Sequence, residues 1–490
     1  MEIYPDFETA LSYSREYKTI PVTARLIADM VTPVNLFLSV RQKNKNCFLL
    51  ESAENEGAFG RYSIIGYNAE TLISFKDGIL KITKDGETNE KPTANPFGEI
   101  NEIIKNNISP VMPGMPKFTG ALTGYFGYDT VRFAEPTVKN CPPDGINAPD
   151  IQLMDCANII VFDHLRQRVT LTTRISAEGD LKENYARAEA VLIEMRGEIY
   201  NLKTSQTESA AEKLSVKPLI SREEFIENVK KAKDYIYNGD IFQVVLSQRF
   251  EISNPPDAFK VYRALRAEEP SPYMYTMCFE DCEIVGSSPE KLISVENGLV
   301  TSCPIAGTIK RGKSESEDKA LESKLLSNEK ERAEHIMLVD LARNDIGKIC
   351  EFGTVNVDKL MQIGRFSKLM HIISQVTGNL KSEYSLTDVL ASSLPAGTLS
   401  GAPKIRAMQI IDEIETQKRG LYGGSIGYMG FNGIMDMCIA IRTAFFSGGK
   451  AYVQAGAGIV ADSVPEAEYE EVLTKTSAVL NAFEKAGELL

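Results

Sequence analysis

The feature that most constrains the fold is a long series of short strand-like segments, each bounded by turn signals, with helical segments placed irregularly between them. Such segments include "YSIIGY", "TLISFKDGILKIT", "GALTGYFGY" and "RVTLTTRI" in the first half, and "IFQVVLSQRFEI", "GSIGYMGF" and "KAYVQAGAGIV" in the second. The "KDG" inside the second of these is typical of a hairpin turn. Because strands and helices do not alternate strictly, the pattern predicts an α+β fold with a large antiparallel sheet.

The chain is long enough for two domains. It has 490 residues, and residues 201–217 form a polar stretch without periodicity after a helical segment at 181–200. We therefore expect a linker there, between a first domain at 1–205 and a second at 218–490. In the second domain, the segment after Ser221 has the pattern of a capped helix. Further helices are expected at 330–345, at 403–416 and from 466.

Composition and charge exclude several classes of protein. The formal net charge of −13 disfavours nucleic acid and anionic membrane as partners. No run of 18 apolar residues is present to span a membrane, and the N-terminal segment "MEIYPDFETA" has no secretory signal, so we expect a cytoplasmic protein. The eight cysteines form no CxxC pair and only three histidines occur, which disfavours a zinc site.

An acidic side chain stands in an apolar helical stripe in "KERAEHIMLVDLARND", residues 330–345. At about 100° per residue, Leu338 and Leu341 fall within roughly 60° of Glu334 on the helix surface. A carboxylate in such a position is satisfied by an ion pair with an arginine or lysine, by a metal ion or by protonation. An ion pair is the simplest interpretation of this segment alone.

A second acidic stripe lies near the end of the chain, where Glu468, Glu471 and Lys475 share one face of the expected helix. Taken alone, such a stripe is typical of a solvated surface. Two helices that both offer carboxylates, in a chain without a Cys/His set, would suit Mg²⁺, because this ion is hard, binds oxygen ligands and keeps several waters. The acidic residues therefore predict a magnesium site as the alternative to structural charge pairs.

Several motifs occur together in the order seen in one known family. They are "PIAGT" (304–308), "AEHIMLVDLARND" (333–345), "GTLSGAPK" (397–404), "YGG" (422–424), "IRTA" (441–444) and "QAGAG" (454–458). With these segments the chain resembles the chorismate-utilising enzymes. "LLESA" (49–53) and "GRYSIIG" (60–66) are similar to the N-terminal domain of the anthranilate synthase large subunits (component I), the branch that matches best. The resemblance implies large antiparallel sheets packed as a sandwich with helices on the outside.

The resemblance also implies a ligand set. In this family two glutamates hold Mg²⁺ against the ring carboxylate of chorismate, and the matching positions are Glu334 and Glu471. Glu468 matches an outer position that holds a metal-bound water. A guanidinium can grip a carboxylate through two hydrogen bonds, and a glycine segment can offer backbone amides. The positions that match substrate contacts are Gly307, Thr308, Tyr422, Arg442, Gly456, Ala457 and Gly458.

The implied reaction has two steps. Ammonia adds at C2 of chorismate while the C4 hydroxyl leaves, and pyruvate is then eliminated to give anthranilate. Since hydroxide leaves poorly, a general acid is needed, and the matching residue is Glu290 in "SSPEKL". His371 matches a residue that orients or protonates the leaving enolpyruvyl group. Thr308 is also expected to be a catalytic residue. Taken alone, His371 in its apolar run has the pattern of a core residue.

Two positions distinguish activities within the family. Relatives that hydrate chorismate use a lysine base where this chain has Gln243, so formation of isochorismate is disfavoured. Aminodeoxychorismate synthases often carry a lysine where this chain has Ala306, which favours anthranilate formation. An aminodeoxychorismate synthase component I of folate biosynthesis is the alternative. An inactive, tryptophan-binding regulatory subunit is an alternative of another class.

The nitrogen donor and the regulator follow from the same resemblance. No G-x-C-x-G nucleophile motif occurs, so we expect a separate glutamine amidotransferase subunit (component II) to supply ammonia. L-Tryptophan is the expected feedback inhibitor, and the positions that match its contacts are Ser52, Glu51, Pro272, Tyr273 and Met274. The alternative for these residues is a structural role in a domain that binds nothing.

Overall fold

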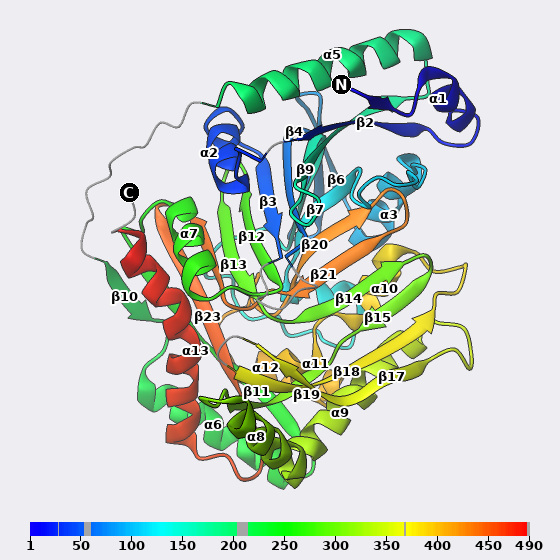
Figure 1. The fold of residues 1–490 in the computed structure, drawn as a ribbon. Coiled ribbons are helices and arrows are strands. Elements are labelled where there is room, and N and C mark those ends of the chain that lie inside the picture. Colours follow the sequence, from blue (N-terminus) through cyan, green and yellow to red (C-terminus); the bar gives the residue numbers. More distant parts are fainter. Residues whose placement is uncertain (28, 53–59, 203–213, 367–368, 488–490) are drawn as a thin grey trace.

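The structure, a computed structural model, describes residues 1–27, 29–52, 60–202, 214–366 and 369–487. Its elements are shown in Figure 1. The strands of the first half are β1 Ile3–Tyr4, β2 Thr19–Ile27, β3 Cys47–Glu51, β4 Tyr62–Lys76, β5 Ile79–Lys84, β6 Glu87–Pro92, β7 Ala121–Phe126, β8 Ile151–Asp163 and β9 Arg168–Ser176. Those of the second half are β10 Ser215–Pro218, β11 Gln243–Ser253, β12 Tyr273–Cys278, β13 Glu283–Ser288, β14 Lys291–Glu296, β15 Leu299–Ser302, β16 Ile305–Lys310, β17 Asn356–Arg365, β18 Leu369–Asn379, β19 Gly401–Ala402, β20 Ser425–Gly430, β21 Met435–Ile439, β22 Thr443–Ser447 and β23 Lys450–Ile459.

The helices lie mainly on the outside of these strands, with α5 along one edge and α6, α8 and α13 along another (Figure 1). They are α1 Phe7–Tyr13, α2 Pro33–Lys43, α3 Pro96–Asn106, α4 Val131–Ala134, α5 Leu181–Tyr200, α6 Arg222–Tyr237, α7 Ala258–Glu268, α8 Glu315–Ser327, α9 Glu329–Gly347, α10 Leu386–Ser393, α11 Gly397–Ser400, α12 Lys404–Ile414 and α13 Pro465–Ala486. The expected helices are therefore confirmed, with ends shifted by a few residues. No helix within the described ranges is long and apolar enough to cross a membrane.

The strand pairing is antiparallel throughout the described residues. Strands β2, β9, β8, β4 and β3 are hydrogen-bonded in that order. Two further pairs connect the halves of the chain, because β3 pairs with β12 and β7 pairs with β20. The α+β class with large antiparallel sheets is thus confirmed.

The hairpin expected at "KDG" joins β4 to β5, with Lys76 opposite Ile79. Asp77 and Gly78 both have positive φ, 49° and 79°. This is the backbone that a two-residue hairpin loop needs to match the twist of its strands, and aspartate followed by glycine adopts it readily.

The expected linker at 201–217 is wrong at its C-terminal end. Residues Ser215–Pro218 form β10, which pairs with β11 and so belongs to the sheet. Residues 203–213 lie outside the described residues. The four side chains of β10 are all exposed, so this strand has no buried apolar face that would mark it in the sequence.

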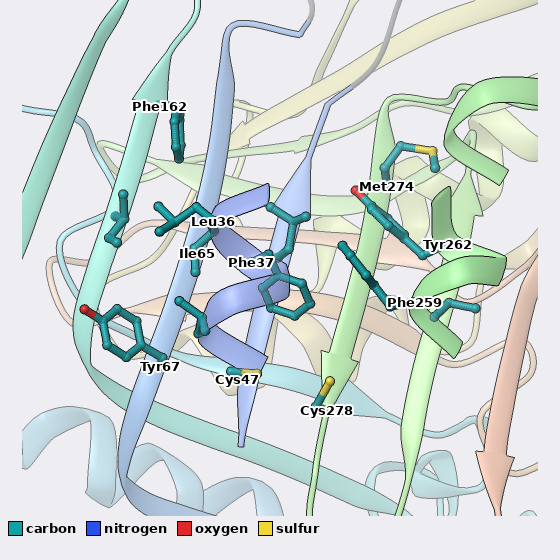
Figure 2. Packing of buried hydrophobic residues seen from close by; sticks show 14 of the residues in the cluster. Leu36, Phe37, Cys47, Ile65, Tyr67, Phe162, Phe259, Tyr262, Met274 and Cys278 are labelled. Carbon is teal, nitrogen blue, oxygen red and sulfur yellow. The ribbon is translucent and has the colours of Figure 1, made fainter. Parts of the chain in front are cut away.

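The largest apolar core is shared between the two halves of the chain. Phe37 of α2 and Phe259 of α7 have ring centroids 5.2 Å apart, and Leu49 of β3 and Phe483 of α13 belong to the same cluster. Figure 2 shows Phe37 and Phe259 facing each other beside the strands. The domains at 1–205 and 218–490 remain a prediction, since strand pairs and this core join the two sides.

Candidate active site

A cavity of about 520 Å³ opens among β11, β16, β18, β23, α9 and α13. Eleven of the twelve residues expected to be catalytic, substrate-binding or metal-binding line it: Glu290, Gly307, Thr308, Glu334, His371, Tyr422, Arg442, Gly456, Gly458, Glu468 and Glu471. Ala457 does not, because neighbouring residues of a strand point to opposite faces and its methyl group is buried in the core. The cavity thus gathers side chains that lie up to 236 positions apart in the sequence, from Gln243 to Val479.

The carboxylates at the cavity come from two helices. Glu334 is half-buried on α9; burial raises its pKa, the neighbouring Glu331 raises it further, and a hydrogen bond from Gln243 opposes this. On α13, burial raises the pKa of Glu468, a hydrogen bond from Ser463 lowers it, and Glu471 raises it. Burial and neighbouring like charges therefore disfavour the charged forms of Glu334 and Glu468, and a bound cation would relieve this.

Two lysines act on this acidic group: Lys330 lowers the pKa of Glu334 and Glu468, and Lys475 is paired with Glu471. The ammonium of Lys475 lies 2.7 Å from a carboxylate oxygen of Glu471, and it donates a 2.9 Å hydrogen bond to the carbonyl of Gly456. Among the described residues, no three His, Cys, Asp or Glu side chains are already grouped as a metal site. Carboxylate oxygens are the ligand type that a hard ion such as Mg²⁺ prefers. In this structure the carboxylates lie as separate groups, and Glu471 is paired with Lys475.

Glu290 has the properties of a general acid. It follows the end of β13, lines the cavity, and accepts a 3.0 Å hydrogen bond from the hydroxyl of Thr398. Burial raises its pKa to about 7, while Thr398 and then Lys475 act in the lowering direction. A carboxyl group with this pKa is available in its protonated form near neutral pH, as a catalytic acid requires.

His371 is held by the strand that carries the "PIAGT" turn. Thr308 lies opposite His371 in the β16–β18 ladder, after an irregularity in the register. The Nδ1 atom of His371 lies 3.0 Å from the Thr308 hydroxyl and 3.1 Å from the carbonyl of Gly307. Since a carbonyl only accepts, we assign the proton of the neutral ring to Nδ1, which leaves Nε2 as an acceptor. Burial lowers the pKa of His371, so the ring is mainly neutral at pH 7.

The "PIAGT" turn needs glycine at Gly307. Its φ is +67°, a conformation that disfavours other residues. A Cβ there would also lie 3.0 Å from a carboxylate oxygen of Glu331 and 3.2 Å from Ile372. The glycine therefore allows this backbone to lie against α9 at the edge of the cavity.

Arg442 brings a largely buried positive charge to the cavity. Burial lowers the pKa of its guanidinium, and Glu269 acts in the raising direction. Its φ of 49° is a left-handed conformation that costs a non-glycine residue roughly 1 kcal/mol or more. A strained backbone that presents a partly desolvated cation to a cavity fits the binding of an anion.

The glycines of β23 let neighbouring side chains approach the strand. A Cβ on Gly456 would lie 2.8 Å from the hydroxyl of Tyr422, and a Cβ on Gly458 would lie 2.7 Å from the side-chain nitrogen of Gln243. Larger residues at these positions would push Tyr422 or Gln243 out of the cavity wall. The sequence indicated backbone amides here, and the structure adds this steric reason for glycine.

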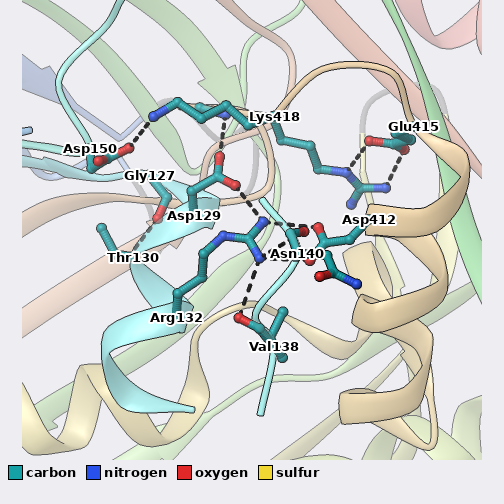
Figure 3. Close-up of polar contacts among 12 residues, drawn as sticks. Gly127, Asp129, Thr130, Arg132, Val138, Asn140, Asp150, Asp412, Glu415 and Lys418 are labelled. Atoms are coloured by element: carbon teal, nitrogen blue, oxygen red, sulfur yellow. Dashed lines mark hydrogen bonds and ion pairs between the residues drawn. The ribbon is translucent and has the colours of Figure 1, made fainter. Parts of the chain in front are cut away.

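Buried ion pairs hold the segment that leads to Tyr422. Lys418 pairs with Asp150 at 2.9 Å, and Arg132 of α4 pairs with Asp412 of α12 at 2.6 Å (Figure 3). These pairs join the first and second halves of the chain. They were not expected, because sequence patterns do not reveal which distant charges become neighbours.

Arg419 belongs to the same group of buried charges. It pairs with Glu415 at 2.6 Å and donates to the carbonyls of Leu399 and Val245, each at 2.6 Å. Its guanidinium also lies 5.7 Å from the ring centre of Tyr422. One buried arginine thus links β11, α11 and the tyrosine of the cavity wall, with every contact of a kind that stabilises a buried cation.

The residues expected to bind tryptophan lie at the paired ends of two strands, with Glu51 and Ser52 at the end of β3 and Pro272, Tyr273 and Met274 at the start of β12. Glu51 lies opposite Met274 in the β3–β12 ladder, and the hydroxyl of Ser52 accepts a 3.3 Å hydrogen bond from a backbone amide. Tyr273 donates to Asp436 at 2.9 Å. Pro272, however, lines the large cavity. The strand β12 therefore connects the expected regulatory residues with the cavity directly.

Glu51 already has a full set of hydrogen bonds. It is buried, and its carboxylate accepts from Tyr262 at 2.5 Å, from Ser63 at 2.8 Å and from Nε of Arg266 at 2.7 Å. Figure 2 shows Tyr262 among the residues of the apolar core cluster. A carboxylate with three strong donors has little capacity left for the amino group of a ligand.

Comparison with known proteins gives a consistent result over nearly the full length. The family model described as chorismate binding enzyme matches residues 45–481. Anthranilate synthase component 1 of Acetivibrio thermocellus is 47% identical, over 99% of each chain. The protein of the same name from Aquifex aeolicus is 44% identical, over 100% of this chain and 99% of its own.

Solved structures share the same fold. Anthranilate synthase component I from Streptococcus pneumoniae matches with a TM-score of 0.76 at 38% identity, over 93% of this chain and 99% of its own. The menaquinone-specific isochorismate synthase from Escherichia coli matches with a TM-score of 0.70 at 18% identity, over 97% and 98%, a likeness of fold alone. Since the family model and these close relatives cover almost the whole sequence, the chain belongs to the chorismate binding enzyme family.

Proposed function

We propose that this chain forms anthranilate and pyruvate from chorismate and ammonia, the first committed step of tryptophan biosynthesis. The observation that carries the proposal is the single cavity in which Glu290, Arg442 and the carboxylates of α9 and α13 meet. The near full-length similarity to proteins named anthranilate synthase component 1 supports the choice of product.

Substrate binding follows from the charges of the cavity. Chorismate has two carboxylates, and Arg442 with the backbone of Gly456–Gly458 would hold the one on the enolpyruvyl side. Glu334 and Glu471 would hold Mg²⁺, with Glu468 in the outer sphere through a water. Bound there, Mg²⁺ supplies positive charge that screens the ring carboxylate of the substrate from the acidic wall.

The first chemical step needs an acid and no protein base. Glu290 protonates the C4 oxygen as ammonia attacks C2, so that the oxygen leaves as water. Gln243 lines the same cavity and cannot remove a proton from water, which disfavours hydration of chorismate. In the second step the proton at C2 leaves, the C3–O bond breaks, and the departing enolpyruvate takes up a proton at its CH₂ carbon to become pyruvate. The neutral His371, held by Thr308 and Gly307, accepts a hydrogen bond or the C2 proton at Nε2, which differs from the expectation that it protonates the leaving group.

Ammonia, regulation and location complete the proposal. A glutamine amidotransferase subunit releases ammonia to this chain in the cytoplasm. L-Tryptophan inhibits through the region around Ser52 and β12, and the position of Pro272 in the cavity wall supports a short route between inhibitor and active site.

A product assay tests the proposal. The purified chain is incubated with chorismate, MgCl₂ and ammonium chloride at alkaline pH, where more of the nitrogen is free ammonia, and anthranilate is followed by its fluorescence. Anthranilate and pyruvate in equal amounts are expected, with no product from glutamine until the partner subunit is added. An amino product that retains the enolpyruvyl group would indicate the folate-pathway activity, and no turnover with tryptophan binding intact would indicate a regulatory subunit.

A further inference from the structure

The backbone of Glu290 is fixed on both sides by hydrogen bonds. The amide of Ile439 donates to the carbonyl of Glu290 at 3.0 Å, and the amide of Glu290 lies 3.4 Å from the hydroxyl of Ser288. That hydroxyl donates in turn to the carbonyl of Ile439 at 2.7 Å. The main chain therefore sets where the Glu290 side chain begins, and the direction of its carboxyl group depends on contacts at the other end.

At that other end, one hydrogen bond to the carboxyl group is present among the described residues. The hydroxyl of Thr398 donates to Oε1 of Glu290 at 3.0 Å. Thr398 lies in α11, where the hydroxyl of Ser400 donates a 2.9 Å hydrogen bond to the carbonyl of Ala396 and so stabilises this short helix. Arg419, which is 2% exposed, donates to the carbonyl of the next residue, Leu399, at 2.6 Å.

From this geometry we infer that Thr398 is a positioning residue, whose hydroxyl occupies Oε1 of Glu290 so that Oε2 carries the proton that is transferred to substrate. The inference rests on the proposed function. In the step it serves, the C2–N bond forms, each ring double bond shifts by one position, and the C4–O bond breaks with its electron pair on oxygen. The Oε2 proton completes water, and the resulting carboxylate keeps the Thr398 hydrogen bond, which strengthens as Glu290 becomes charged.

The charged groups around Glu290 come from several elements. Lys475 of α13 lowers its pKa, while burial raises it. Lys291 and Asp345 line a small pocket of about 40 Å³ that Glu290 and Thr398 share on one side. Across the large cavity the other charged or titratable residues are Glu269, Lys330, Glu331, Glu334, His371, Tyr422, Arg442, Glu468 and Glu471. Replacing only the Thr398 hydroxyl leaves all of these in place, so its effect can be measured separately.

The test compares Thr398→Val, which keeps the shape and removes the donor, with Thr398→Ser, which keeps the donor. Turnover is measured with ammonium from pH 6.5 to 9, and each variant is divided by wild type at the same pH and ammonia concentration, so that ammonia ionisation cancels. Thr398→Val should be about 10- to 100-fold slower at pH 7. The ratio of wild-type to Thr398→Val turnover should shrink as pH rises. Without the hydrogen bond from Thr398, the pKa of Glu290 is higher, so Glu290 stays protonated to a higher pH than in wild type. Thr398→Ser should stay within about threefold of wild type.

The outcomes separate this inference from the proposed function. Failure of wild type to form anthranilate rejects both. If wild type is active, full activity of Glu290→Gln overturns the inference together with the assignment of Glu290 as the acid, while the formation of anthranilate itself stands. A Thr398→Val activity close to wild type, or a deficit that is constant with pH, also overturns it, since a purely structural role would not change the pH profile. Thr398→Ala serves as the hydroxyl-free variant if the valine does not fold, as judged by thermal unfolding.

Discussion

Lys475 forms a 2.7 Å ion pair with Glu471, one turn earlier on α13, at the edge of the cavity that also holds Glu334. Both side chains are about half exposed, 51% and 49%. The lysine thus neutralises a carboxylate that we propose as a ligand of Mg²⁺, and the two cations compete for it.

The first prediction concerns that competition. In Lys475→Met, Glu471 loses its lysine partner, so the free chain should bind Mg²⁺ about two- to fivefold more tightly, the effect expected of a half-exposed ion pair. Isothermal titration with MgCl₂ in the absence of chorismate measures this directly. Weaker magnesium binding in the variant would show that Lys475 supports the site instead of competing with it.

The second prediction concerns the proposed ligands. Glu334→Gln and Glu471→Gln should each lower turnover by about 100-fold or more and abolish the rise in melting temperature that MgCl₂ gives the wild type. Glu470→Gln, an exposed neighbour that does not line the cavity, is the matched control. Magnesium-dependent stabilisation that survives in both variants would contradict the assignment.

The third prediction concerns Glu290. Its raised pKa of about 7 means that the acid form is lost as pH rises through 7, so turnover at a fixed concentration of free ammonia should fall above that pH. Glu290→Gln should reduce turnover by about 10²- to 10⁴-fold. A rate that is flat with pH, with ammonia held constant, would argue for a different acid.

The raised pKa of Glu290 also has a consequence for stability. The folded chain binds this proton more tightly than the unfolded chain, so ionisation between about pH 4.5 and 7 costs folding free energy. Relative to Glu290→Gln, the free energy of unfolding of wild type should therefore decrease across that interval and then level off. Urea unfolding at several pH values compares the two proteins.

The fourth prediction concerns regulation. Ser52→Phe should relieve inhibition by tryptophan, with activity retained, because Ser52 is absent from the cavity lining and a phenyl group would fill the expected inhibitor site. The chain contains no tryptophan, so the fluorescence of the added ligand can be followed without background from protein tryptophan. Unchanged binding and inhibition in the active variant would remove Ser52 from the site.

The fifth prediction separates Glu51 from Ser52. In the wild type, Tyr262, Ser63 and Arg266 all donate to the carboxylate of Glu51. Glu51→Gln replaces this acceptor with an amide, so it should lower the free energy of unfolding by about 1–3 kcal/mol. The exposed Glu16→Gln is the control. A variant of full stability that has lost only tryptophan binding would instead favour direct contact with the inhibitor.

The sequence by itself determined the class of fold and the location of several elements. Period-two segments with turn signals gave the antiparallel strands, and "KDG" gave the β4–β5 hairpin, because a two-residue loop restricts backbone angles locally. Helix α6 begins after Ser221, whose hydroxyl accepts from the amide of Glu224, a contact encoded within four residues. Local rules suffice where the determining contacts are local.

Only the tertiary structure decided which charges meet. From the sequence, Glu334 could be satisfied by an ion pair, a metal ion or protonation. The structure places Glu334 in a cavity with Glu471. Lys475, which shares a helix stripe with Glu471, pairs with that residue. The exposed β10 and the Thr398–Glu290 hydrogen bond had no signal in the sequence pattern. Contacts across more than a hundred residues depend on how sheets and helices pack, and side-chain periodicity contains no information about the distant partner.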